Sequence, residues 1–209
     1  MYIDAIYDKK SDLVRVVERV DGDRILVDHK PEYDFYVEDP KGRYHSIYGE
    51  AVSQVKCRNL REFRKNQAIM NNNKTYESDI KPVFKTLSKH YSNAESPKLN
   101  TAFFDIEVDF DPVLGYASPE EAFSSITAIG VYLQWQNAMI CLSVPPKTLN
   151  WEQATNIAEK LPEVILCKTE KEMLDMFLVL IGDADILSGW NSDGYDIPYT
   201  INRIKKVMG

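Results

Sequence analysis

The most constraining feature of the sequence is the segment 101–108, an apolar run that is interrupted by Asp105 and Glu107. Its Phe, Ile and Val residues predict a buried β-strand. Because side chains alternate along a strand, the two carboxylates point to one face. Phe104 and Ile106 then point to the opposite face. The segment is therefore expected to carry a pair of acidic side chains on one face and an apolar surface on the other.

Paired carboxylates in such a strand need a compensating positive charge, because burying an unpaired charge is costly. Pairs of oxygen ligands are what Mg²⁺ and Mn²⁺ prefer. We therefore interpret Asp105 and Glu107 as metal ligands. The alternative is an edge strand whose acidic face is merely solvated, and the bulky flanking residues Phe103 and Val108 argue against it.

The residues from 99 onward predict a mixed sheet flanked by helices, which is an α/β arrangement. Thr169 and Glu172 have the spacing of a helix capping box. The strands are expected at 101–108, 126–135, 138–144, 164–167 and 185–190, and the helices at 151–161, 169–181 and 198–209.

The residues before 99 predict a separate, smaller and β-rich domain, so the chain as a whole is α+β. A meander of four strands is expected at 2–7, 13–19, 24–28 and 33–37. Asn59 is expected to cap one amphipathic helix that runs through Met70. This combination is typical of an open barrel or an RRM-like module. The polar segment 92–97 separates the expected domains, 1–98 and 99–209.

Composition excludes several classes of protein. The 209 residues contain no apolar run of the roughly 20 residues needed to span a bilayer. The N-terminus has neither the basic region nor the apolar region of a secretory signal. The three cysteines form no C-x-x-C pair and are interpreted as free thiols in a reducing compartment. We therefore expect a soluble cytoplasmic protein without a membrane partner.

Charge is distributed unevenly along the chain. Residues 41–98 carry 12 basic and 5 acidic side chains, whereas residues 99–209 carry 7 basic and 16 acidic ones. A basic stretch interleaved with Leu60 and Phe63 could contact nucleic acid, although a solvated helix face is at least as good an interpretation. The basic residues concerned are Lys56, Arg58, Arg61, Arg64 and Lys65.

A second polar cluster spans residues 187–199, where an apolar strand ends, a glycine-containing turn follows and a helix begins near Pro198. Asp196 is therefore expected close to a helix N-terminus at the carboxyl end of a strand, where sites in α/β sheets usually lie. Taken alone, Asp196 could be a helix N-cap and Asn191 a turn residue.

Together the two clusters resemble the exonuclease motifs of family B DNA polymerases. Residues 104–107, Phe-Asp-Ile-Glu, resemble the first motif, and Asn191 followed by Tyr195-Asp196 resembles the second. The stretch 189–205 is similar to the replicative polymerases of T-even-type bacteriophages. Ile47-Tyr48-Gly49 and the segment 76–82 also resemble parts of the N-terminal region of these polymerases.

The resemblance implies a ribonuclease H-like 3′–5′ exonuclease domain preceded by the family's N-terminal domain. It implies that Asp105 bridges two divalent ions, Mg²⁺ or Mn²⁺, that Glu107 binds one ion and orients the attacking water, and that Asp196 binds the other. It assigns contacts with the single-stranded 3′ end of DNA to Asn191, Tyr195 and Tyr116. It also implies RNA or single-stranded DNA binding at the basic segment.

The family's third exonuclease motif, a Tyr followed by an Asp, is expected well downstream of the second and does not occur before Gly209. We therefore interpret the chain as an N-terminal part of a DNA-replicating polymerase. The rest would lie in the same or a separate chain, and this part alone would be weakly active or inactive. Two alternatives stay open, a non-catalytic nucleic-acid-binding module and an interaction scaffold.

Overall fold

A computed structural model of the chain describes residues 2–70, 72–95 and 97–209. Met1, Asn71 and Ser96 lie outside the described residues, and Ser96 falls within the segment expected to separate the domains. The chain divides into two compact units, Met1–Pro97 and Lys98–Gly209. Within the described ranges, no helix is long and apolar enough to cross a membrane.

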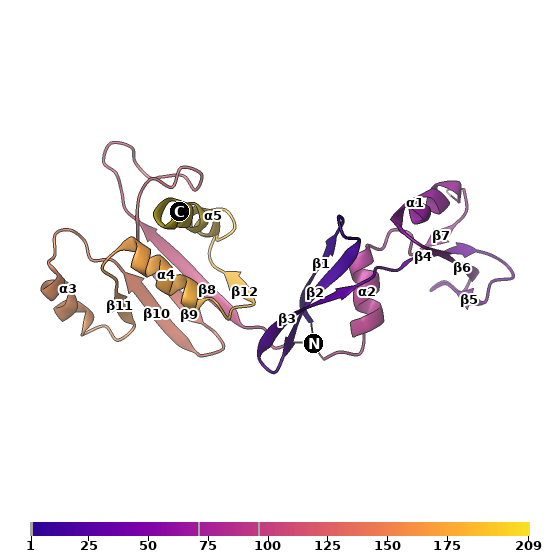
Figure 1. Cartoon of the computed structure of the whole chain (residues 1–209), viewed down its shortest axis with the longest axis horizontal. Coiled ribbons are helices and arrows are strands. Elements are labelled where there is room, and N and C mark those ends of the chain that lie inside the picture. The colour runs from indigo at the N-terminus through magenta and orange to yellow at the C-terminus, as the bar shows by residue number, and fades with distance from the viewer. Residues whose placement is uncertain (1, 71, 96) are drawn as a thin grey trace. The chain divides into compact units, whose positions relative to one another are not determined.

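The first unit contains two separate sheets and two helices (Figure 1). One sheet is an antiparallel meander of β1 (Tyr2–Asp8), β2 (Leu13–Val20) and β3 (Asp23–His29). The other has the order β5-β6-β4-β7 and comprises β4 (Tyr33–Glu38), β5 (Tyr44–His45), β6 (Ala51–Cys57) and β7 (Thr75–Tyr76). The helices are α1 (Leu60–Ile69) and α2 (Pro82–Tyr91).

The expected four-strand meander with a single helix is wrong in this unit. The fourth expected strand, β4, leaves the meander and pairs with β6 and β7. Its side chains Tyr33 and Phe35 are buried, and both rings pack near Phe63 of α1. β3 exposes most of its side chains, buries none and remains the edge strand of the three-stranded sheet. Asn59 caps α1 as expected.

The second unit is built on one five-stranded sheet of order β11-β10-β9-β8-β12. The three central strands are antiparallel, and the two edge strands run parallel to their neighbours. The predicted mixed sheet flanked by helices is confirmed. The strands are β8 (Thr101–Val108), β9 (Ile126–Leu133), β10 (Ala138–Ser143), β11 (Val164–Leu166) and β12 (Ile186–Ser188).

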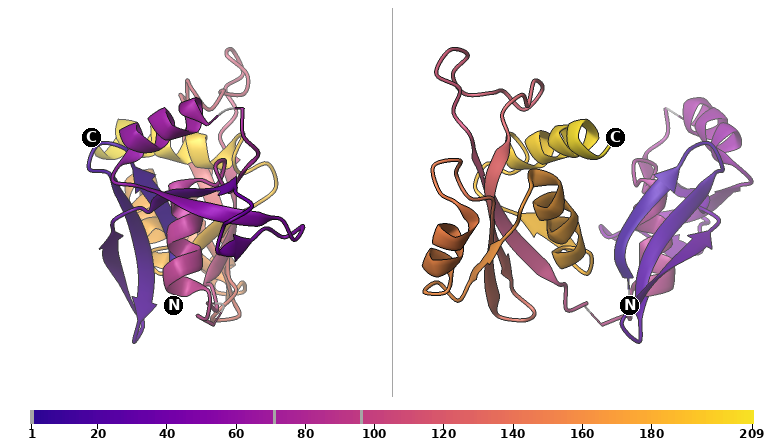
Figure 2. Two further views of the ribbon diagram at one scale, coloured as in Figure 1. Left: turned by 90° about the vertical axis from the view of Figure 1, so that its right-hand side faces the viewer. Right: turned by 60° about the vertical axis from the view of Figure 1, so that its left-hand side comes forward.

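Helices cover the two faces of this sheet unequally. α4 (Glu170–Leu180) and α5 (Asp196–Met208) lie on one face, and α3 (Trp151–Ala158) lies on the other side near β11 (Figure 2). Phe104 of β8 packs against Phe177 of α4 with ring centroids 5.3 Å apart. Among the described residues of the second unit, no helix lies over the opposite face of β8 (Figure 2).

Helix α5 anchors the long loop that joins β8 to β9. Polar side chains on successive turns of α5 donate hydrogen bonds to backbone carbonyls of this loop, so the loop is held along the helix. The donor–acceptor pairs are Tyr195 and Ala117 at 3.2 Å, Tyr199 and Ser124 at 2.8 Å, and Asn202 and Pro119 at 2.9 Å.

Arg203 completes this attachment with a buried ion pair. Its Nε donates to Oε1 of Glu170 at 2.8 Å, and the remaining carboxylate oxygen contacts Nη2. Nη1 donates to the carbonyl of Ala122 at 3.0 Å. Glu170 also accepts the backbone N–H of Ile126 at 2.8 Å. The pair therefore joins α4, α5, the loop and the start of β9.

We expect Arg203→Ala to lower the free energy of unfolding by about 3–5 kcal/mol, because it leaves the Glu170 carboxylate buried without its partner. Urea unfolding followed by circular dichroism measures the loss. Lys171→Ala is the matched control, since it removes an exposed pair with Asp175 that is worth about 0.5 kcal/mol. Equal losses in the two variants would contradict a structural role for the buried pair.

Candidate exonuclease site

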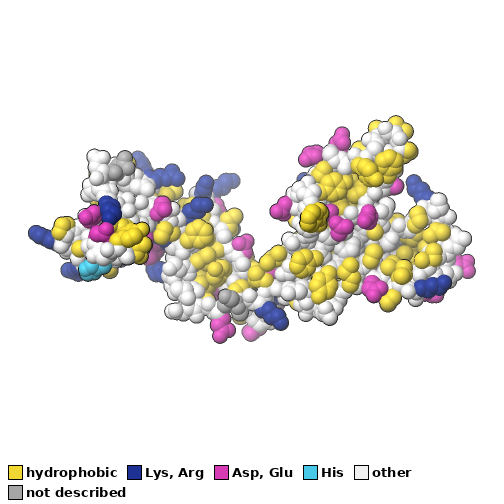
Figure 3. All heavy atoms as spheres, turned by 180° about the vertical axis from the view of Figure 1, so that it is seen from behind, with side chains coloured by type: hydrophobic (Ala, Val, Ile, Leu, Met, Phe, Trp, Pro, Cys, Tyr) yellow, Lys and Arg dark blue, Asp and Glu magenta, His cyan; other side chains and the backbone are white. Residues whose placement is uncertain are grey.

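The acidic face of β8 is arranged as its sequence predicts. Phe104 and Ile106 are buried, whereas Asp105 and Glu107 are exposed on the opposite face. β8 lies between β9 and β12, so it is not an edge strand. Its acidic face is nevertheless exposed to solvent, as the alternative to a metal site predicted, and the carboxylates of β8 are not buried. Figure 3 views unit 2 from the side away from α4 and α5, where acidic side chains lie among hydrophobic ones.

The turn between β12 and α5 approaches β8 closely at Gly189. A Cβ at this position would lie 2.3 Å from the carbonyl oxygen of Phe104, so a side chain here would force the turn away from β8. Asn191 adopts a left-handed conformation with φ of 56°, which Asn tolerates better than most residues. Its carbonyl accepts the N–H groups of Gly194 and Tyr195. These contacts bring the start of α5 next to the middle of β8.

Asp196 is the first residue of α5 and is only 4% exposed. It is not the N-cap, since that position belongs to Tyr195. Burial raises the pKa of the Asp196 carboxyl, and the negative charge of Asp105 raises it further. The backbone N–H of Ile106 opposes this shift and lowers the pKa. Asp196 therefore lies close enough to Asp105 on β8 for their charges to interact.

The donor chemistry of this pair fits a divalent cation. Two carboxylates lie close enough to repel each other, Asp196 is almost fully buried, and no described Lys or Arg forms a salt bridge with it. A cation between them would relieve the repulsion and provide hard-ion coordination. Glu107 lies on the same face of β8. In the described ranges, however, no three His, Cys, Asp or Glu side chains are grouped tightly enough to hold a metal ion.

The other residues expected to contact substrate have different environments. Tyr195 is half-buried and stacks on Tyr199 with centroids 5.3 Å apart, so it packs the start of α5. Tyr116 is 76% exposed in the β8–β9 loop, where it packs beside Phe110 with ring centroids 5.0 Å apart. Asn191 is exposed at the turn. Of the two tyrosines, Tyr116 therefore has the accessible ring.

Comparisons with known proteins identify the family of the chain. Residues 46–209 match the sequence model of a family described as DNA polymerase family B, exonuclease domain. The chain belongs to this family. It is 25% identical over 207 residues to the DNA-directed DNA polymerase of Escherichia phage RB69, covering 88% of this chain and 23% of that protein.

A second relative is the DNA polymerase delta catalytic subunit of Plasmodium falciparum (isolate K1 / Thailand). It is 28% identical over 198 residues, which cover 86% of this chain and 15% of that subunit. The chain therefore spans less than a quarter of the length of either family B relative.

The basic residues of the N-terminal unit lie apart from the carboxylates in sequence, on β6, on α1 and between them. All are exposed, and none takes part in a salt bridge within the described part of the chain. Phe63 on the same helix is directed instead toward Tyr33 and Phe35. The set comprises Lys56, Arg58, Arg61, Arg64 and Lys65.

Sequence reasoning missed two features that position the candidate site, and it placed one residue in the wrong element. Gly189 was an isolated glycine, and its need for a close backbone approach depends on β8, a strand far away in the sequence. The Arg203–Glu170 pair joins residues 33 positions apart. Trp190, which belonged to an expected strand at 185–190, is instead 92% exposed in the turn beyond the shorter β12.

We expect Asp196→Asn to stabilise the protein at neutral pH without divalent ions. The folded-state pKa of Asp196 is raised, so folding takes up a proton, and stability falls as pH rises from the ordinary Asp range through that pKa. Asp196→Asn cannot ionise at this position, so its stability does not fall over this pH range. Thermal unfolding across pH, with EDTA or with Mg²⁺, measures the effect.

Mg²⁺ should stabilise the wild type and leave Asp196→Asn unchanged. Asp193→Asn is the matched control, because Asp193 is exposed in the same turn. If Asp196→Asn lowers the unfolding temperature at neutral pH, or responds to Mg²⁺ like the wild type, the paired-carboxylate site is wrong.

Proposed function

We propose that this chain provides the 3′–5′ proofreading exonuclease site of a family B DNA polymerase that replicates phage DNA. The observation that carries the proposal is the buried carboxyl of Asp196 beside Asp105 on β8, without a cationic partner among the described residues. The RB69 relative is a phage polymerase, and the second relative is also a polymerase subunit.

In this proposal Asp105, Glu107 and Asp196 hold two Mg²⁺ or Mn²⁺ ions. The ions, when bound, activate the attacking water and stabilise the leaving 3′ oxygen of an in-line displacement at phosphorus. Glu107, exposed beside Asp105 on β8, orients the water and accepts its proton. Asp196 contributes a carboxylate whose position is set by the packing of α5.

The β8–β9 loop supplies the contact with the DNA 3′ end. Tyr116 and Phe110 present exposed rings at its tip, and stacking on a single-stranded base is worth about 1–3 kcal/mol. Asp111 accepts the N–H groups of Val113 and Leu114 at 2.8 Å, which orders the turn that carries Tyr116. Asn191, exposed in the turn at the start of α5, holds the substrate strand.

We expect Asp105→Ala to reduce release of the 3′-terminal nucleotide from single-stranded DNA by about a thousandfold. Losing several kcal/mol of transition-state stabilisation costs about tenfold for each 1.4 kcal/mol. Excision is measured with end-labelled DNA in Mg²⁺ or Mn²⁺. The 209-residue chain is assayed alone and also with a segment carrying the family's third exonuclease motif, which should increase the rate.

Asp109→Ala is the matched control, because Asp109 follows β8 and is also an exposed carboxylate. It should retain most of the wild-type rate. Excision that persists in Asp105→Ala, or no excision in either form of the assay, would contradict the proposal.

The basic residues of the N-terminal unit support a second proposed function, binding of RNA or single-stranded DNA. The supporting observation is that these exposed cations have no salt-bridge partner in the described ranges. It does not depend on the carboxylates of the second unit. Each phosphate that they neutralise should add to the salt dependence of binding. We further propose that the partner of this chain is the rest of the polymerase, in the same or a separate chain. The proposed location is the cytoplasm.

We expect the triple variant Arg61→Glu, Arg64→Glu and Lys65→Glu to abolish binding of a single-stranded RNA or DNA oligonucleotide. The wild-type affinity should fall steeply with salt, with a slope of about −0.7 for each phosphate contact on a log–log plot. Fluorescence anisotropy measures the affinity of the variant and the salt dependence of wild-type binding. The control exchanges Lys9 and Lys10, which lie on the β1–β2 turn, for Glu. Binding that survives the triple variant would place the contact elsewhere.

A further inference from the structure

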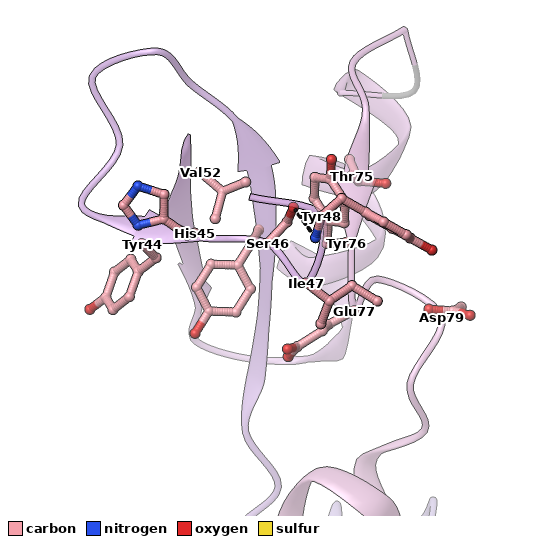
Figure 4. Close-up of a pocket in the computed structure, with 11 residues that line it drawn as sticks. Tyr44, His45, Ser46, Ile47, Tyr48, Val52, Thr75, Tyr76, Glu77 and Asp79 are labelled. Atoms are coloured by element: carbon pink, nitrogen blue, oxygen red, sulfur yellow. Dashed lines mark hydrogen bonds between the residues drawn. The ribbon is translucent and has the colours of Figure 1, made fainter. Parts of the chain in front are cut away.

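The N-terminal unit contains a cavity of about 530 Å³ that the proposed functions do not use (Figure 4). Its walls come from β4, from β5 and β6 with the turn between them, and from β7 with the residues after it. The turn contains Ile47 and Tyr48, and the segment after β7 contains Glu77 and Asp79. Two family-like sequence motifs that are separate in the chain therefore meet at one cavity.

Four tyrosines form the aromatic part of the wall, and two of them already interact with a cation. Lys74 Nζ lies 5.9 Å from the ring centroid of Tyr48 and 5.4 Å from that of Tyr76. Tyr36 and Tyr44 pack edge to face with centroids 5.5 Å apart, and neither has a described cation over its ring. The wall thus has room for a second cation–π contact.

The cavity is acidic as well as aromatic. Glu77 and Asp79 line it, and the charge of Glu77 helps to raise the pKa of Tyr36, after the larger effect of burial. Lys74 forms a 2.6 Å salt bridge with Glu50, which neutralises it. Lys85 lies 3.8 Å from Glu77 but has a closer partner, Asp34, at 3.0 Å. An excess of negative charge therefore surrounds the rings.

The turn that carries Tyr48 is held in place by its own hydrogen bonds. Ser46 Oγ accepts the N–H of Tyr48 at 3.1 Å and bonds the carboxylate of Glu50. Gly49, with φ of 89°, permits the left-handed bend that follows. Ile47 is 91% exposed at the rim of the cavity. The wall is therefore ordered while its mouth stays open to a ligand.

We propose that this cavity binds the guanidinium group of an arginine side chain in a basic peptide segment of a protein partner. A planar cation can stack on Tyr36 or Tyr44 and pair with the carboxylate of Glu77. Phosphate is repelled by Glu77 and Asp79, so a nucleotide is a poorer ligand. The basic side chains that contact cavity residues, Lys74 and Lys85, are paired with Glu50 and Asp34. Lys41 and Arg43 line a separate cavity that shares Tyr44.

The test is an NMR titration of the full chain, carrying ¹³C-labelled tyrosine rings, with the peptide acetyl-Gly-Arg-Gly-amide. Saturable shifts are expected for Tyr36 and Tyr44, and acetyl-Gly-Gln-Gly-amide should cause none. Glu77→Gln and Tyr44→Ala should each weaken binding by about three- to tenfold. Asp23→Asn, at an exposed carboxylate on β3, is the matched control and should bind like the wild type.

Three outcomes would overturn the proposal. One is the absence of saturable shifts with the arginine peptide in a folded wild-type chain. Another is equal binding of the Gln peptide, which would show that the charge plays no part. The third is tighter binding of thymidine monophosphate than of the arginine peptide at the same rings, which would make the cavity a nucleotide site. None of these outcomes depends on exonuclease activity.

Discussion

The strict alternation of β8 is the constraint on which the second unit depends. One face of this strand supplies Phe104 and Ile106 to the core under α4 and α5, and the other presents Asp105 and Glu107. A shift of one residue in its pairing would bury both carboxylates and expose both apolar side chains. β8 lies inside the sheet and is paired on both sides, which holds the register.

Helix α5 carries an unfavourable charge at its start and stabilising contacts further along. It places Asp196 next to Asp105, where burial and repulsion raise the pKa of the Asp196 carboxyl. The same helix is held by Tyr199 and by the buried pair of Arg203 with Glu170. These contacts offset the cost of the paired carboxylates, as is usual where a binding site stores unfavourable charge. They also attach the loop that carries Tyr116 to the helix that carries Asp196.

The N-terminal unit has two surfaces of opposite chemistry. Exposed cations extend from β6 to α1, and Glu77 and Asp79 line an aromatic cavity next to β7. A single phosphate-rich ligand would suit the cations and be repelled at the cavity. This difference in charge is why separate ligands are proposed for the two surfaces.

Local patterns in the sequence determined the faces of β8, the caps at Asn59 and Thr169, and the identity of the carboxylates in the two motifs. These features depend on neighbours within a few residues, so periodicity and capping rules suffice to predict them. The departure of β4 from the meander did not follow from such rules, because it depends on pairing with β6 and packing against Phe63. The proximity of Asp196 to Asp105 likewise required the tertiary structure, since they lie 91 positions apart in the sequence and the backbone contact at Gly189 brings their elements together.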